Sequence, residues 1–208
     1  MSVDFTFALA GPPLPLFELM VGIESRMEEM GFRKSGNVYK VELDERGVFE
    51  ENEEYVISMK KFEDSKTELK NWNGLSVEFY CSDFTAYVLI ANYENQYINS
   101  FIEVSGKVMD KLLSDDKMGS FFQLILAIAV SIQSFGGFGT YELPFEPVAP
   151  DKAIPYIFRN TEGVPSLLGI IPYNMTDESK LRKTAEKEFS ITVSTMGFYF
   201  LEHKDFRS

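Results

Sequence analysis

The first residues of the chain alternate apolar and polar side chains, with apolar residues at every second position from 3 to 9. A period of two predicts a strand with one buried face. Three prolines end this run, and apolar residues then recur at spacings of three and four between Leu14 and Met30. That spacing predicts an amphipathic helix. Gly31 follows it directly and is the expected C-terminal stop.

Strand-like alternation returns after this helix in several short runs. Polar connections, including Asn73-Gly74, separate the runs and predict an antiparallel meander. In the predicted register Tyr55, Ile57 and Met59 share one buried face, and Cys81 points inward as a small buried hydrophobe. The runs span residues 39–43, 55–59, 75–81 and 86–91.

The period then changes to a helical one. Apolar residues at spacings of three and four predict a helix over residues 95–113, and Asp115 or Asp116 is placed to cap a second helix. This second helix contains the most apolar part of the chain, residues 121–132. A membrane span needs about 20 apolar residues, so we expect a buried core helix.

Three glycines follow the apolar helix, at positions 136, 137 and 139. A dinucleotide-binding fingerprint has its glycines after a strand and before a helix, which is the reverse of the order here. We therefore interpret them as the helix exit, with one glycine in the left-handed conformation. A strand is expected to follow at residues 140–143.

The last third of the chain starts with an irregular, proline-rich segment at residues 144–172, which contains six of the nine prolines. Its aromatic residues indicate an ordered lid over the core, and a groove for a ligand is the alternative. A polar helix at residues 174–187 and strands at 189–193 and 198–200 complete the chain. These elements predict a single globular α+β domain over residues 1–208, in which a mainly antiparallel sheet is covered by the helix 14–30 and by a central helical pair between residues 95 and 134.

The net charge of the chain limits the kinds of partner that we expect. Thirty-two acidic against 20 basic residues give a formal net charge of -12. Such a charge repels nucleic-acid phosphates and anionic lipid surfaces and attracts basic proteins. We therefore expect no nucleic acid and no membrane as partner.

Candidate chemistry is sparse. One cysteine, Cys81, and one histidine, His203, leave no HExxH motif and no histidine cluster, and no GxSxG elbow is present. We expect no catalytic group, no cofactor and no metal, although carboxylate pairs among the acidic residues stay open. The single cysteine and the absence of a basic N-terminal region fit a cytoplasmic protein.

One connection between strand-like runs concentrates the charge. Between positions 44 and 54 six acids face a single arginine, Arg46. A solvated hairpin loop that discourages aggregation explains this pattern. The functional hypothesis is a surface that steers a basic partner, with an aromatic anchor inside the charged rim. The predicted partner-binding residues are Asp44, Glu45, Phe49, Glu50, Glu51, Glu53 and Glu54.

The function favoured by the sequence is protein binding without catalysis. A small, acidic, cytoplasmic α+β domain with an acidic loop and no catalytic constellation resembles the general character of bacterial immunity proteins, which neutralise toxins. The resemblance is one of class and rests on no motif. The alternative is a small-molecule binding domain, or a carboxylate- or metal-dependent enzyme, with a pocket between the sheet and the proline-rich segment.

Overall fold

The computed structural model describes residues 3–159 and 163–207, and within them the chain forms one ten-stranded sheet. The strand order is β3-β2-β4-β5-β6-β1-β7-β8-β10-β9, and every neighbouring pair is antiparallel. The predicted α+β class with a meander-like antiparallel sheet is confirmed. The strands are β1 (Phe5–Gly11), β2 (Arg33–Leu43), β3 (Phe49–Ser58), β4 (Gly74–Tyr80), β5 (Thr85–Tyr93), β6 (Tyr97–Val104), β7 (Gly136–Tyr141), β8 (Leu168–Pro172), β9 (Phe189–Val193) and β10 (Phe198–His203). The helices are α1 (Leu16–Glu29), α2 (Lys66–Leu69), α3 (Gly106–Ser114), α4 (Met118–Ser131), α5 (Pro150–Ala153), α6 (Pro155–Phe158) and α7 (Glu178–Ala185).

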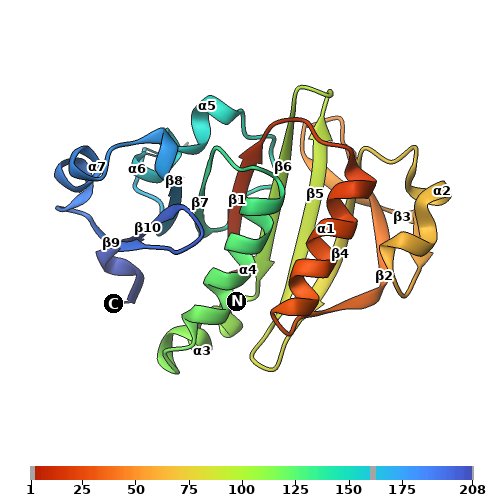
Figure 1. Ribbon diagram of the computed structural model, residues 1–208, viewed down its shortest axis with the longest axis horizontal. Coiled ribbons are helices and arrows are strands. Elements are labelled where there is room, and N and C mark those ends of the chain that lie inside the picture. The colour runs from red at the N-terminus through yellow and green to blue at the C-terminus, as the bar shows by residue number, and fades with distance from the viewer. Residues whose placement is uncertain (1–2, 160–162, 208) are drawn as a thin grey trace.

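The first face of the sheet carries the larger core. Helices α1 and α4 cross in front of the sheet, with β2 and β3 at one end and β9 and β10 at the other (Figure 1). The apolar stripe of α1 and nearly all sides of α4 are buried against inward residues of the strands. Gly31 ends the α1 region with φ +83°, as predicted, and the Phe32 N–H donates to the Met27 carbonyl at 2.8 Å. This is the hydrogen bond of a glycine-terminated helix.

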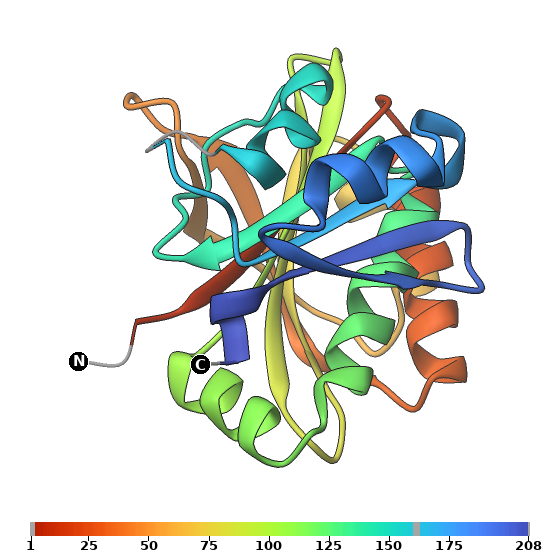
Figure 2. The same cartoon turned by 90° about the vertical axis from the view of Figure 1, so that its left-hand side faces the viewer.

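The second face is covered by the later part of the chain. Figure 2 shows α5 and α6 on the side of the sheet opposite α1 and α4. Val148, Ala153 and Ile157 of the proline-rich segment are buried there, together with Leu181 of α7. Residues 160–162 of the proline-rich segment lie outside the described residues. Residues 144–158 of this segment pack as a lid over the second core. The prediction of an irregular segment up to residue 172 is wrong at its end, because Leu168–Pro172 form β8 between β7 and β10.

The prediction of a helix over 95–113 is wrong for its first half. Residues 97–104 form β6, which lies between β5 and β1 in the middle of the sheet. Ile98 and Ile102 pack in the first core and Phe101 in the second. A strand buried on both faces has apolar residues without a period of two, and their spacing imitated a helical stripe. Only α3 remains of that helix, so the helical pair is α3 and α4.

The prediction that the three glycines form the helix exit is also corrected. The residue in the left-handed conformation after α4 is Gln133, with φ +53°, while Gly137 and Gly139 lie inside β7. A Cβ on Gly139 would lie 2.6 Å from Phe7 Cδ2 and 2.8 Å from Phe5 Cζ. These glycines allow buried rings to lie directly on the strand. Gly137 and Gly139 are therefore needed for close packing within a strand and not for the exit of the helix.

Helix α4 is the buried core helix that the sequence predicted. Phe121, Leu124, Ile128 and Ala129 are fully buried against the sheet and α1. None of the helices within residues 3–159 and 163–207 is long and apolar enough to cross a membrane.

Candidate functional site

The acidic connection is shorter as a loop than the sequence predicted. The turn occupies residues 44–48, and Glu50, Glu51, Glu53 and Glu54 belong to β3, an edge strand of the sheet. Asp44 builds the turn, because its Oδ1 accepts hydrogen bonds from the backbone N–H groups of Val48 at 2.8 Å and Arg46 at 2.9 Å. The Val48 N–H contributes most to holding the pKa of Asp44 below its usual value, and Arg46 adds to it.

Arg46 neutralises only part of the hairpin. Its guanidinium donates to Asp44 at 2.6 Å and also to Glu50. Glu45, Glu53 and Glu54 are exposed, and none of them forms an ion pair within the described part of the chain. The hairpin therefore presents uncompensated negative charge to solvent.

Phe49 does not lie in an accessible rim. Its side chain is only 3% exposed and packs in the second core, with its ring centroid 6.1 Å from that of Phe101. Its N–H donates to the Phe145 carbonyl at 2.9 Å, which fastens β3 to the proline-rich segment. The predicted anchor is therefore not available on this surface, because the hairpin lies with Phe49 against the second face of the sheet.

A different aromatic residue is exposed beside the acids. Residues 53–55 have no partner in β2, since Tyr39 pairs with Val56 and the next residue, Lys40, pairs with Asn52. In this bulge Tyr55 is 52% exposed, and Val56 beside it is 47% exposed. The sequence alternation had placed Tyr55 on a buried face. A bulge reverses such an assignment, because it inserts residues that have no opposite neighbour.

Glu51 points into a pocket of about 370 Å³ on the second face of the sheet. We name it the tyrosine–glutamate pocket. Glu51 accepts a hydrogen bond from the Ser76 hydroxyl, and Glu78 lies directly opposite Tyr87 in the β4–β5 pair. The pocket is lined by Ser35, Gly36, Asn37, Tyr39, Glu51, Val77, Glu78 and Tyr87.

The position of the Tyr87 ring is set by packing. It stacks on Phe145, with ring centroids 5.8 Å apart and an interplanar angle of 18°. Burial raises the pKa of Tyr87, so that the phenol keeps its proton, and the nearby Glu51 carboxylate adds to the effect. Across the β5–β6 pair Tyr87 faces Glu103, whose pKa burial also raises. Glu51, Glu78 and Glu103 are thus arranged around one tyrosine, a grouping that the sequence analysis missed because the three residues come from β3, β4 and β6.

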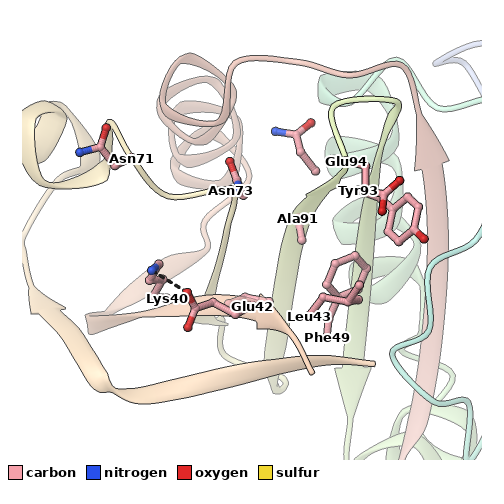
Figure 3. Close-up of a pocket in the computed structure, with 11 residues that line it drawn as sticks. Lys40, Glu42, Leu43, Phe49, Asn71, Asn73, Ala91, Tyr93 and Glu94 are labelled. Atoms are coloured by element: carbon pink, nitrogen blue, oxygen red, sulfur yellow. Dashed lines mark hydrogen bonds and ion pairs between the residues drawn. The ribbon is translucent and has the colours of Figure 1, made fainter. Parts of the chain in front are cut away.

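A second pocket, of about 350 Å³, opens at the other end of the hairpin. Figure 3 shows Asn71 and Asn73 before β4, Tyr93 and Glu94 at the end of β5, and the ion pair between Lys40 and Glu42 on β2, 2.7 Å long. Hydrogen bonds from Lys40 and Asn52 lower the pKa of Glu42. Lys40 compensates the charge of Glu42 here, whereas the lining of the tyrosine–glutamate pocket contains no lysine or arginine.

A third pocket, of about 500 Å³, lies between β2 and the end of α1. Beside it Lys34 Nζ is 3.9 Å from a carboxylate oxygen of Glu24, and both side chains are buried. Burial raises the pKa of Glu24 and lowers that of Lys34. None of these three pockets is lined by the proline-rich segment, where the alternative hypothesis placed a ligand site.

Comparison with known proteins assigns no family to this chain. No family model matches the chain, and no curated protein matches it. A solved structure that resembles it is the Pseudomonas aeruginosa T6SS protein PA0821, with 11% sequence identity and a TM-score of 0.49. The match covers 96% of this chain and 66% of that one, so this chain spans slightly less than two thirds of its length.

Within residues 3–159 and 163–207 no group of three or more histidine, cysteine, aspartate or glutamate side chains is arranged to hold a metal ion. Cys81 is partly buried against the first core, in keeping with its predicted inward position. His203 ends β10 with its ring centroid 5.2 Å from that of Phe189.

Proposed function

We propose that this chain is a non-catalytic protein-binding domain that binds a basic protein through the acidic β2–β3 hairpin, as an immunity protein binds a toxin. The observation that carries the proposal is the uncompensated charge of Glu45, Glu53 and Glu54. The nearby cations are engaged elsewhere, since Arg46 pairs with Asp44 and Glu50, and Lys40, which lies over the Tyr55 ring, pairs with Glu42. Clustered charge of one sign accelerates encounter with an opposite surface and disfavours wrong partners.

The exposed Tyr55 and Val56 provide apolar contact area, which the charged residues alone do not provide. Charged rims contribute mainly to association rate, whereas apolar and aromatic contacts at the centre of an interface determine how slowly a complex dissociates. Tyr55 lies directly after Glu53 and Glu54 in β3 and is 52% exposed, so a partner that reaches these acids can also contact its ring. Tyr55 therefore takes the role that the sequence analysis gave to Phe49.

Acidic residues on the sheet extend the same charge toward the second face. Glu103 is partly buried with no cation beside it in the described residues, and only the Thr6 hydroxyl donates to its carboxylate, at 3.2 Å. Such a carboxylate lowers the stability of the fold at neutral pH. Residues of a functional site can lower the stability of the fold, because function and stability trade off against each other.

The test is association kinetics with a partner captured from the source cell on the tagged chain and then purified. The variant Glu45→Gln, Glu53→Gln, Glu54→Gln removes the three unpaired hairpin charges. A matched control, Glu29→Gln, Glu63→Gln, Glu68→Gln, removes the same charge from exposed positions on α1, α2 and the turn between β3 and α2. We expect the hairpin variant to associate at least several-fold more slowly at low salt, and the control close to the parent rate. The difference should shrink above about 0.15 M salt, where the Debye length is about 8 Å.

The toxin part of the proposal is tested in cells. Expression of the captured protein alone should reduce the viability of a bacterial host, and co-expression of this chain should restore it. The hairpin variant should protect less well than the control variant at equal expression. Equal association rates for the two variants would refute the hairpin as the binding surface, and a captured protein without effect on viability would refute the immunity role.

A further inference from the structure

The tyrosine–glutamate pocket combines a concave shape with charge of one sign. Its lining contains two carboxylates, Glu51 and Glu78, and no lysine or arginine. Neither carboxylate forms an ion pair with any residue of the described ranges. The pocket at the other end of the hairpin has its own cation, Lys40, and this one has none.

The Glu51 carboxylate is held in place before any ligand arrives. One of its oxygens accepts the hydrogen bond from Ser76, a fully buried residue of β4. The neighbouring Tyr87 ring is fixed by its stack on Phe145. A binding group whose side chains are already ordered loses less conformational entropy when a ligand binds.

The wall opposite Glu51 adds a second acceptor and a second ring. Glu78 is exposed on β4, in register with Tyr87, and Tyr39 lies across the β2–β4 pair from Ser76. The lining thus offers carboxylate oxygens together with two phenol rings. A guanidinium group fits this chemistry best, because it is planar, donates up to five N–H hydrogen bonds to carboxylates and stacks on aromatic faces.

We propose that the tyrosine–glutamate pocket is a socket for an arginine side chain of the basic partner. This inference rests on the proposed function for its biological occupant, and it names the residue that the partner inserts. Glu51 and Glu78 accept the guanidinium N–H groups, and Tyr39 and Tyr87 flank the side chain. The unpaired acids of the hairpin then attract the partner over a distance, and this pocket binds it once the two surfaces are in contact.

The experiment uses Nα-acetyl-L-arginine amide as the probe and its uncharged analogue, Nα-acetyl-L-citrulline amide, as the matched control. Each is titrated into the ¹⁵N-labelled full chain, and amide chemical shifts are followed by NMR. We expect the arginine probe to shift the amides of Gly36, Asn37, Val77 and Glu78 with an affinity on the order of millimolar, as for a single side chain. The citrulline probe should produce no saturable shift there.

Two charge-matched variants locate the binding. Glu51→Gln with Glu78→Gln should weaken the arginine probe at least tenfold, whereas Glu53→Gln with Glu54→Gln, outside the pocket lining, should change its affinity by less than about threefold, since exposed charges are strongly screened. The spectra also report whether each variant is folded. Because Glu51 accepts the Ser76 hydrogen bond, the exposed Glu78→Gln alone serves as a second variant, with an expected loss of at least threefold.

Equal shifts with both probes, shifts away from the pocket, or unchanged affinity in the Glu78 variants would overturn the arginine socket. These outcomes are distinguishable from failure of the proposed function. If the arginine probe fails to bind but the hairpin variant still slows association with the partner, the socket is refuted and the protein-binding role stands. If the probe binds in the pocket while the hairpin acids do not affect the partner, the hairpin surface is refuted.

Discussion

Replacing Gly139 by alanine tests why β7 is rich in glycine. Gly139 lies opposite Phe7 in the β1–β7 pair and within reach of Phe5. An added Cβ would lie 2.6 Å from Phe7 Cδ2 and 2.8 Å from Phe5 Cζ. Carbon atoms pack best at about 3.5–4.0 Å, so both rings would have to retreat by about an ångström.

The rings have no space to retreat. Phe5 and Phe7 are fully buried, and Phe5 also packs against Phe121, Tyr141 and Phe206, with centroid distances of 6.0, 5.3 and 5.5 Å. Overpacking of a filled core costs about 1–3 kcal/mol, while the loss of glycine flexibility in the unfolded chain returns about 0.4–1 kcal/mol. The net expectation is a decrease of about 1–2 kcal/mol in the free energy of unfolding. For a chain of this length that lowers Tm by about 2–8 °C.

The assay is urea unfolding of the parent and two alanine variants. Gly22→Ala is the control, because Gly22 is an exposed position in α1 with no atom within 4 Å of the added Cβ. It should raise the free energy of unfolding by about 0.5–1 kcal/mol, the usual gain in a helix interior. Replacement of glycine by alanine should therefore lower the urea midpoint at position 139 and raise it at position 22. The m-value should stay unchanged in both variants.

A double-mutant cycle identifies the cause. Phe7→Leu removes the ring that contacts the added Cβ, so Gly139→Ala should cost less in that background than in the parent. A Gly139→Ala variant as stable as the parent would show that the close packing does not constrain β7. The glycine would then have no structural requirement at this position.

Two further predictions concern the core and the acidic sheet face. Ala129→Asp in α4 should lower the free energy of unfolding by at least about 3 kcal/mol or prevent folding, because a fully buried position would receive an unpaired charge. A variant that unfolds at the same temperature as the parent would contradict the buried position of Ala129. Glu103→Gln should stabilise the protein at pH 7, because burial raises the pKa of Glu103 above its ordinary value of 4.5 and the native state of the parent loses stability as pH rises through that raised pKa. The advantage of the variant should disappear below pH about 4.5, and thermal unfolding at several pH values would reject the idea if the advantage were independent of pH.

The sequence determined the elements whose local signals agree with their tertiary environment. Helix α1 combines a three-and-four apolar spacing with a glycine stop at Gly31, and both are present in the structure. Helix α4 is apolar on nearly every side because the sheet and α1 cover it. The antiparallel pairs β2–β3 and β4–β5 follow from short polar connections. β3 and β4 are joined by residues 59–73, which contain α2, and are not neighbours in the sheet.

The candidate site could be predicted only in part. Charge is a property of composition, so the acidic hairpin, and the proposal of a basic partner for it, came from residues 44–54 alone. The burial of each side chain depends on register, and the bulge in β3 left Tyr55 exposed. Phe49 was placed against Phe101 and Phe145 by the way the hairpin lies on the second face.

Only the tertiary structure decided the features that depend on distant neighbours. β6 became a strand because it fills the centre of the sheet between β5 and β1, where hydrogen bonds on both edges and cores on both faces outweigh its helix-like spacing. The tyrosine–glutamate pocket exists because strand pairing brings Glu51 of β3 next to β4 and β5. Its residues carry no shared pattern in the sequence, since the register of separate strands, and not local spacing, brings them together.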